Sequence, residues 1–93
     1  MSVDWCRGSI STGTASTTLL RTELRLFGAL VATEGKPVHS HVLIRSTWPD
    51  ATGEVTTRHA LRAYMQSLRH RLKRLGVHGK LRRVRGIGYS FGP

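Results

Sequence analysis

The clearest pattern of hydrophobic positions lies between residues 57 and 75. Five apolar residues recur there at spacings of four, three, four and three: Leu61, Met65, Leu68, Leu72 and Leu75. At about 100° per residue they fall on one narrow stripe, which is typical of a helix with one buried face. The pattern therefore predicts a long helix over Thr57–Leu75, capped by Thr56 or Thr57 and terminated by Gly76.

A shorter helix is predicted upstream, over Arg21–Glu34, with Gly35 as its C-terminal stop. Its expected buried face consists of Leu24, Phe27, Leu30 and Val31. Glu23 falls in the first turn, where a carboxylate interacts favourably with the helix dipole.

A second helix is predicted to begin at His39 or Ser40 and to end at Trp48. Ser40 is chemically the better N-cap, whereas a cap at His39 would place Val38 and Leu43 in a hydrophobic staple. The residues alone leave both starting points open. The side chains expected to face inward are those of Val42, Leu43 and Thr47.

The first 19 residues show the alternation and the turn residues of short strands. Strands are predicted around Val3 and Trp5, over Ser9–Thr12 and over Ala15–Leu19. They would form a small antiparallel meander. An unstructured N-terminus is the alternative, because short strands are only weakly determined by single-sequence patterns.

The last segment predicts a β-hairpin over residues 80–92. Its apolar positions are Leu81, Val84, Tyr89 and Phe91. Gly86 and Gly88 flank the turn, where we expect a positive φ that only glycine adopts at low cost. Arg83 and Arg85 lie toward the tip of the outgoing strand.

Short strands, three helices and a terminal hairpin, in this order, predict an α+β protein with the layout of a winged helix-turn-helix. We divide the chain into N-terminal short strands over residues 1–18 and a winged-helix domain over residues 19–93. A chain of 93 residues buries roughly 60–65% of its unfolded surface, which suffices for one small core.

The charge is distributed very unevenly along the chain. The formal net charge is +10, yet residues 1–54 hold five acidic and five basic residues and are neutral overall. Residues 55–93 hold ten basic residues and no acidic one. Such one-sided positive charge is the electrostatic footprint of a nucleic-acid-binding protein, with an anionic membrane surface as the formal alternative.

The long helix carries much of this charge and has no acidic residue to balance it. Four cations line one flank of the apolar stripe: Arg58, Arg62, Arg69 and Lys73. Opposite the stripe we place His59, Ala63, Gln66, Ser67, His70 and Arg74. A solvated helix normally mixes charges of both signs, so this face favours contact with a polyanion. Ala63 is small enough to meet a thymine methyl group, Gln66 can pair with adenine in a bidentate manner, and the basic flank suits phosphates.

Other classes of function lack the residues they need. The single cysteine, Cys6, cannot form an internal disulfide, and the five histidines show no spacing beside it that predicts a zinc site. The five carboxylates are scattered, and the glycine pair at Gly86 and Gly88 is not followed by the helix that a phosphate-binding loop requires. No apolar run approaches the ~20 residues of a membrane span, and no signal peptide is visible. We therefore expect a cytoplasmic, non-enzymatic protein without metal, cofactor or membrane attachment.

Four sequence motifs make the chain similar to a known family. They are Leu19-x-x-Thr22-Glu23-Leu24, Trp48, Leu68-Arg69-x-x-Leu72 and Val84-Arg85-Gly86-Ile87-Gly88-Tyr89. In order and approximate spacing they resemble the LTxxE, Trp, LRxxL and VRGxGY motifs of the OmpR/PhoB-type DNA-binding effector domain of bacterial response regulators. The resemblance implies that the helix over 57–75 enters the major groove of DNA and that the wing over 80–92 reaches the adjacent minor groove. The receiver domain that precedes this module in the family lies outside these 93 residues.

Carried over residue by residue, the resemblance also implies a binding surface. Combined with the helix-face argument above, it gives these candidate DNA-binding residues: Trp48, His59, Arg62, Ala63, Tyr64, Gln66, Ser67, Arg69, His70, Lys73, Arg83 and Arg85. The loop over Pro49–Thr56, with Asp50 and Glu54, corresponds to the segment that meets RNA polymerase in some members of the family.

Double-stranded DNA is the expected partner of this sequence-specific regulator of transcription. RNA polymerase and a second copy of the chain, on tandem or inverted half-sites, are further candidate partners. The main alternative is a small basic RNA-binding protein, for instance one associated with the ribosome. Duplex RNA hides its major groove from a helix, and single-strand binders usually stack bases on exposed aromatic residues. Here Phe27, Tyr89 and Phe91 occupy core-like positions, which favours DNA.

Overall fold

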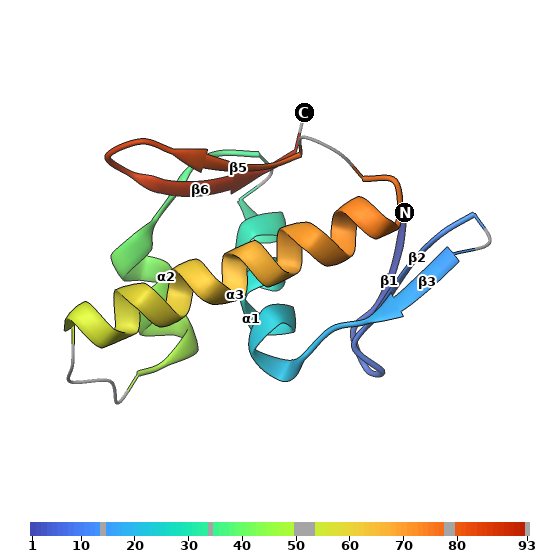
Figure 1. Cartoon of the computed structure of the whole chain (residues 1–93), viewed down its shortest axis with the longest axis horizontal. Coiled ribbons are helices and arrows are strands. Elements are labelled where there is room, and N and C mark those ends of the chain that lie inside the picture. Colours follow the sequence, from blue (N-terminus) through green and yellow to red (C-terminus); the bar gives the residue numbers. More distant parts are fainter. Residues whose placement is uncertain (14, 34, 50–53, 78–79, 93) are drawn as a thin grey trace.

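The computed structural model describes residues 1–13, 15–33, 35–49, 54–77 and 80–92, and for residues 54–57 it describes the helix but not the side chains. In chain order the elements are β1 (Ser2–Asp4), β2 (Ser9–Thr12), β3 (Ala15–Thr18), α1 (Arg21–Ala32), β4 (Val38–His39), α2 (Ser40–Thr47), α3 (Glu54–Arg74), β5 (Leu81–Val84) and β6 (Gly88–Phe91). The strands form two antiparallel sheets, in the orders β1-β2-β3 and β4-β6-β5 (Figure 1). The predicted α+β class, with three helices and a terminal hairpin, is confirmed.

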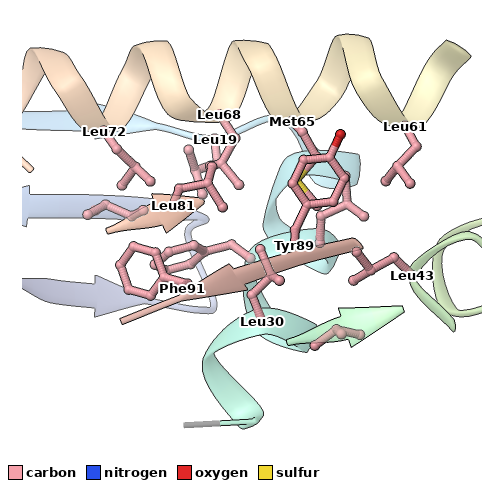
Figure 2. Close-up of a cluster of buried hydrophobic side chains, with 14 of the residues drawn as sticks. Leu19, Leu30, Leu43, Leu61, Met65, Leu68, Leu72, Leu81, Tyr89 and Phe91 are labelled. Carbon is pink, nitrogen blue, oxygen red and sulfur yellow. The ribbon is translucent and has the colours of Figure 1, made fainter. Parts of the chain in front are cut away.

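The long helix α3 crosses the middle of the molecule (Figure 1). Its apolar stripe is buried as predicted. Figure 2 shows Leu61, Met65, Leu68 and Leu72 pointing from α3 toward side chains of the other helices and of the hairpin. The start of the helix was predicted wrongly. It begins at Glu54, so Thr56 and Thr57 lie inside it and do not cap it.

The C-terminus of α3 is closed by its own backbone and by the first sheet. Gly76 has φ +82°, and the N–H of Val77 donates to the carbonyl of Leu72 over 2.9 Å, which is a Schellman-type termination. The hydroxyl of Thr12 in β2 donates to the carbonyl of Leu75 over 2.7 Å. The β1-β2-β3 meander is therefore attached to the end of α3.

The N-terminal strands agree closely with the prediction, and Ile10 of β2 is fully buried in the core. Trp5 lies just beyond β1, half-exposed, with its ring 6.0 Å from that of Phe27. An unstructured N-terminus is not what the structure shows. The division into segments 1–18 and 19–93 stays a prediction.

The buried face of α1 differs from the predicted one. The helix buries Glu23, Leu26, Phe27 and Leu30, whereas Val31 is 37% exposed and Leu24 is half-buried. The reason is that the carboxylate of Glu23 lies on the face that contacts α3. A prediction based on apolar residues alone therefore places the buried face too far around the helix. The helix also ends at Ala32 and not at Glu34, which lies outside the described residues.

The start of α2 is decided in favour of His39, which is the N-cap although its side chain makes no capping hydrogen bond. Leu43 and Thr47 are buried as predicted, but Val42 is 43% exposed. The sequence analysis missed β4, which pairs with β6 of the hairpin through Val38 and His39. A strand of two residues is too short to show a hydrophobic period.

Candidate nucleic-acid interface

The outer face of α3 is polar, basic and exposed along most of its length. Of the residues placed there from the sequence, five are exposed: His59, Ala63, Gln66, His70 and Arg74. The cations of the predicted flank, Arg58, Arg62, Arg69 and Lys73, are exposed as well. Burial of the opposite stripe fixes the rotation of the helix, so these side chains project from one side of the domain.

Ser67 is the exception on this face. Its hydroxyl donates to Oε2 of Glu23 over 2.7 Å, so its side chain turns toward α1 and not outward as predicted. The cause is the fully buried carboxylate of Glu23, which also accepts from Nε of Arg71 at 3.1 Å and from the N–H of Leu20 at 2.7 Å. These contacts join α1 to α3 and hold the orientation of α3 in the domain.

The carboxylate of Glu23 has a second role, at the start of α1, besides its contacts with α3. Leu20 is the N-cap, with extended backbone (φ −66°, ψ 155°), and leucine has no side-chain acceptor for the free N–H groups of the first turn. Only the reciprocal half of a capping box forms, from the Leu20 N–H to the Glu23 carboxylate. The sequence analysis assigned Glu23 to the helix dipole and missed its role between the helices.

Trp48 and Tyr64 lie against one another where α2 ends. Their ring centroids are 5.8 Å apart with an interplanar angle of 42°, and both residues are half-buried against the core. Trp48 is also the C-cap of α2, with its N–H donating to the carbonyl of Ile44 over 2.7 Å. The pair therefore joins the end of α2 to α3 while leaving part of each ring accessible.

The wing is the hairpin formed by β5 and β6, with Arg83 and Arg85 exposed on it. Gly86 has the expected positive φ, +79°. The reason predicted for Gly88 was wrong, because Gly88 is not among the residues with positive φ. A Cβ at Gly88 would instead lie 2.0 Å from the carbonyl oxygen of Val38 and 2.7 Å from the nitrogen of Ser40. Glycine is required there because β4 approaches the wing closely.

Two hollows lie between the outer parts of α3 and the wing. The larger is a groove of about 640 Å³, which we call the basic groove; it lies between the starts of α2 and α3 and the turn of the wing. The smaller, of about 200 Å³, is lined by Arg62, Gln66, Arg69 and Arg83 together with the buried Met65 and Tyr89. Arg62 and Arg83 line both hollows. The structure thus brings the basic helix face and the basic wing onto one continuous surface.

The remaining predicted site residues cannot be placed in this way. Asp50 lies outside the described residues, and Glu54 is the first residue of α3. Among the described residues, no three side chains of the histidine, cysteine or carboxylate type gather in a way that could hold a metal ion. Nor does that part of the chain contain a helix long and apolar enough to cross a membrane.

The basic groove contains residues that the sequence analysis did not assign to the interface. His39 and His41 line it from the start of α2, opposite His59 of α3. No local pattern marks them, because their approach to the wing depends on β4. The sequence offered one signal for them, namely that His39 and His41 flank the predicted start of the second helix.

Several solved structures have a similar fold. The C-terminal domain of the nisin resistance regulator NsrR, a lantibiotic response regulator, is 22% identical with a TM-score of 0.80, covering 97% of this chain and 88% of that one. The DNA-binding domain of the response regulator AdeR, solved in complex with an intercistronic region, is 21% identical with a TM-score of 0.78, covering 97% and 90%. The DNA-binding domain of E. coli CadC is 19% identical with a TM-score of 0.81, covering 95% and 81%.

At these identities, the structural neighbours show the fold alone. No curated protein matches the sequence closely enough to be counted as a relative. A family model described as "Transcriptional regulatory protein, C terminal" matches residues 14–91, which is most of the chain. The resemblance to OmpR/PhoB-type effector domains is thereby confirmed, and the chain belongs to the family of C-terminal domains of transcriptional regulatory proteins.

Proposed function

We propose that this domain binds double-stranded DNA sequence-specifically and regulates transcription, with α3 in the major groove and the wing, residues 80–92, in the adjacent minor groove. The observation that carries the proposal is the continuous basic surface, in which Arg62 of α3 and Arg83 of the wing line the same two hollows. The major groove of B-DNA is wide enough to admit an α-helix, and the polar, basic outer face of α3 suits its base edges and phosphates. Residues 55–93 contain no acidic residue that would oppose the phosphates.

Within this surface, the exposed residues divide by chemistry. Gln66 can read adenine through a bidentate pair, and Ala63 leaves room for a thymine methyl group. The long cations bind phosphates and position the domain without reading sequence: Arg62, Arg69 and Lys73. His59 and His70 add contacts along the same face.

Two further parts of the surface flank the helix. The half-exposed Trp48–Tyr64 pair would contact the backbone beside α2. Arg85, exposed at the turn of the wing, suits a narrow minor groove, whose negative potential attracts guanidinium groups. Ser67 supports the surface from behind through Glu23 and is not itself assigned to a DNA contact.

The test compares two variants by fluorescence anisotropy on duplex DNA over a range of salt concentrations. Arg69→Ala should weaken binding to all sequences alike and lower the slope of log K against log salt by about one unit. Gln66→Ala should leave the slope unchanged and relax discrimination at one or two base pairs by about 1–3 kcal/mol. Arg25→Ala, which removes the same charge from an exposed position on α1, is the matched control and should change the affinity less than twofold.

An RNA-binding function is the competing class, and the same assay separates it. Phe27, Tyr89 and Phe91 are buried, so the sheets offer no aromatic platform from these residues for single-stranded RNA. We expect duplex DNA to be bound more tightly than duplex or single-stranded RNA at equal salt. Equal or tighter binding of either RNA would contradict the DNA proposal.

We also propose partners other than DNA, namely RNA polymerase and a second copy of the chain. Because carboxylates and phosphates repel each other, we expect the segment around Asp50 and Glu54 to lie away from the DNA, where it would be available to RNA polymerase. A second copy of the chain would bind a neighbouring half-site. We propose that the protein acts in the cytoplasm and has no enzymatic activity. The double variant Asp50→Lys/Glu54→Lys should spare affinity for the DNA site while changing transcription output, whereas a large gain in affinity would place the segment beside the DNA backbone.

A further inference from the structure

Three of the five histidines line the basic groove. His39 and His41 come from the start of α2, with ring centroids 5.3 Å apart, and His59 comes from the first described turns of α3. All three are exposed. The groove between α2, α3 and the wing thus holds a concentration of imidazoles that no single segment of the sequence reveals.

The other groups that face these rings are also basic. Arg58 and Arg62 line the groove from α3, and Arg83 lines it from the wing. The remaining titratable side chain on the lining is the phenol of Tyr89, and none of the described lining residues is acidic. The groove therefore has three permanent positive charges and three side chains that can add more.

We infer that phosphates of the DNA backbone occupy the basic groove and that DNA binding is coupled to protonation of His39, His41 and His59. The inference rests on the proposed function and extends its interface to the start of α2. Imidazole is the side chain that normally changes charge between pH 5 and 8. A proton added to one of these rings places a positive charge among three guanidinium groups, and a phosphate in the groove compensates for that charge.

The physical consequence follows from linkage. If the complex holds more protons than the free protein and free DNA together, the association constant rises as the pH falls, by up to about tenfold per pH unit for each proton taken up. The phosphodiesters of DNA do not titrate near neutral pH, so the protons taken up from solvent bind to groups of the protein. Permanent cations such as Arg83 contribute affinity without this dependence.

The experiment measures the Kd for a fluorescein-labelled DNA duplex of about 20 base pairs and arbitrary sequence at pH 6.0 and pH 8.0, at constant ionic strength. The unmodified protein should bind about tenfold more tightly at pH 6.0, which corresponds to an average uptake of about half a proton between the two pH values. The variant His39→Gln/His41→Gln leaves His59 and its proposed contact on the α3 face unchanged. It should show a pH effect of less than about threefold and match the parent within about threefold at pH 8.0. Titration calorimetry in two buffers of different ionisation enthalpy should show proton uptake that the variant loses.

Two controls separate the possible causes. Arg83→Gln should weaken binding at both pH values by the same factor and so preserve the pH effect. Melting temperatures of the parent and of the histidine variant, recorded at both pH values, exclude a loss of fold, and the single variant His41→Gln tests the idea independently.

The outcomes distinguish this inference from the function it rests on. Absence of duplex binding at either pH would overturn the proposed function itself. Binding with the same Kd at both pH values, or a histidine variant that keeps the full pH effect, would leave the proposed function standing and overturn the proton coupling.

Discussion

Glu23→Gln tests the contact that sets the orientation of α3. The substitution preserves the shape of a fully buried side chain and removes its charge. Three donors converge on the carboxylate: Leu20 N–H on Oε1, and Ser67 Oγ and Arg71 Nε on Oε2. An amide keeps one acceptor and replaces the other with an NH₂ group, so at least one donor is left facing another donor.

The expected cost follows from these contacts. A hydrogen bond to a charged group contributes about 1.5–3 kcal/mol, and removing one partner of a buried ion pair costs about 3–5 kcal/mol. The side chain of Arg71 is 32% exposed, so water hydrates it once the carboxylate is gone. We therefore expect a loss near the lower limit, about 3 kcal/mol of the free energy of unfolding.

Urea unfolding followed by circular dichroism measures this loss. With a slope of about 1.5 kcal/mol/M for a domain of this size, the midpoint should fall by about 2 M. The matched control is Asp4→Asn, which neutralises an exposed carboxylate 3.8 Å from Arg7 and should cost less than about 0.5 kcal/mol. Ser67→Ala removes one donor and should cost about 1 kcal/mol while leaving DNA affinity within about twofold.

The reasoning fails if Glu23→Gln is no more costly than Asp4→Asn, because the buried carboxylate would then contribute nothing that an amide cannot. It fails in a second way if Ser67→Ala weakens DNA binding strongly while stability is unchanged. In that case the hydroxyl would act at the DNA surface and not on Glu23.

Two further substitutions test local backbone features. Leu20→Ser should raise stability by about 1 kcal/mol in thermal unfolding, because it supplies the missing N-cap acceptor of α1; Leu20→Ala controls for loss of a side chain that is 51% exposed, and an equal gain from both would refute the capping argument. Gly88→Ala should cost about 3 kcal/mol, since its Cβ would meet the Val38 carbonyl oxygen of β4. Gly86→Ala, at φ +79° with open space around it, should cost only about 1 kcal/mol, and equal costs would show that close approach is not the reason for Gly88.

Elements with a strong internal period were predictable from the sequence. The stripe of α3 repeats over five apolar residues, and each of them is buried. The hairpin was predictable for a similar reason, because its apolar positions and its glycine turn lie within one short segment. In both cases, local sequence contains the information that tertiary packing uses.

The errors arise where a residue's environment is supplied by a distant segment. Glu23 looks like a surface residue of a first turn until Ser67 and Arg71, 44 and 48 residues away, supply its partners. Because Glu23 is polar, the sequence analysis left it out of the buried face of α1 and assigned that face to the wrong residues. The histidines at the start of α2 line the basic groove beside the wing, to which β4 is paired through β6, and no local period encodes that pairing.

The pairing of β4 with the wing has a consequence for the entropy of association. The hairpin is tied to the start of α2 by the register pairs Val38–Tyr89 and His39–Gly88 and by the Ser40 N–H bond to the Ile87 carbonyl, 3.0 Å long. In the proposed complex, the distance between α3 and the wing would therefore be fixed before DNA binds. The protein would then lose little conformational entropy on binding. Any change of shape needed for a good fit would then have to occur in the DNA duplex. Sites whose groove geometry already matches this separation, or whose base steps deform easily toward it, would be selected even at base pairs that no side chain touches.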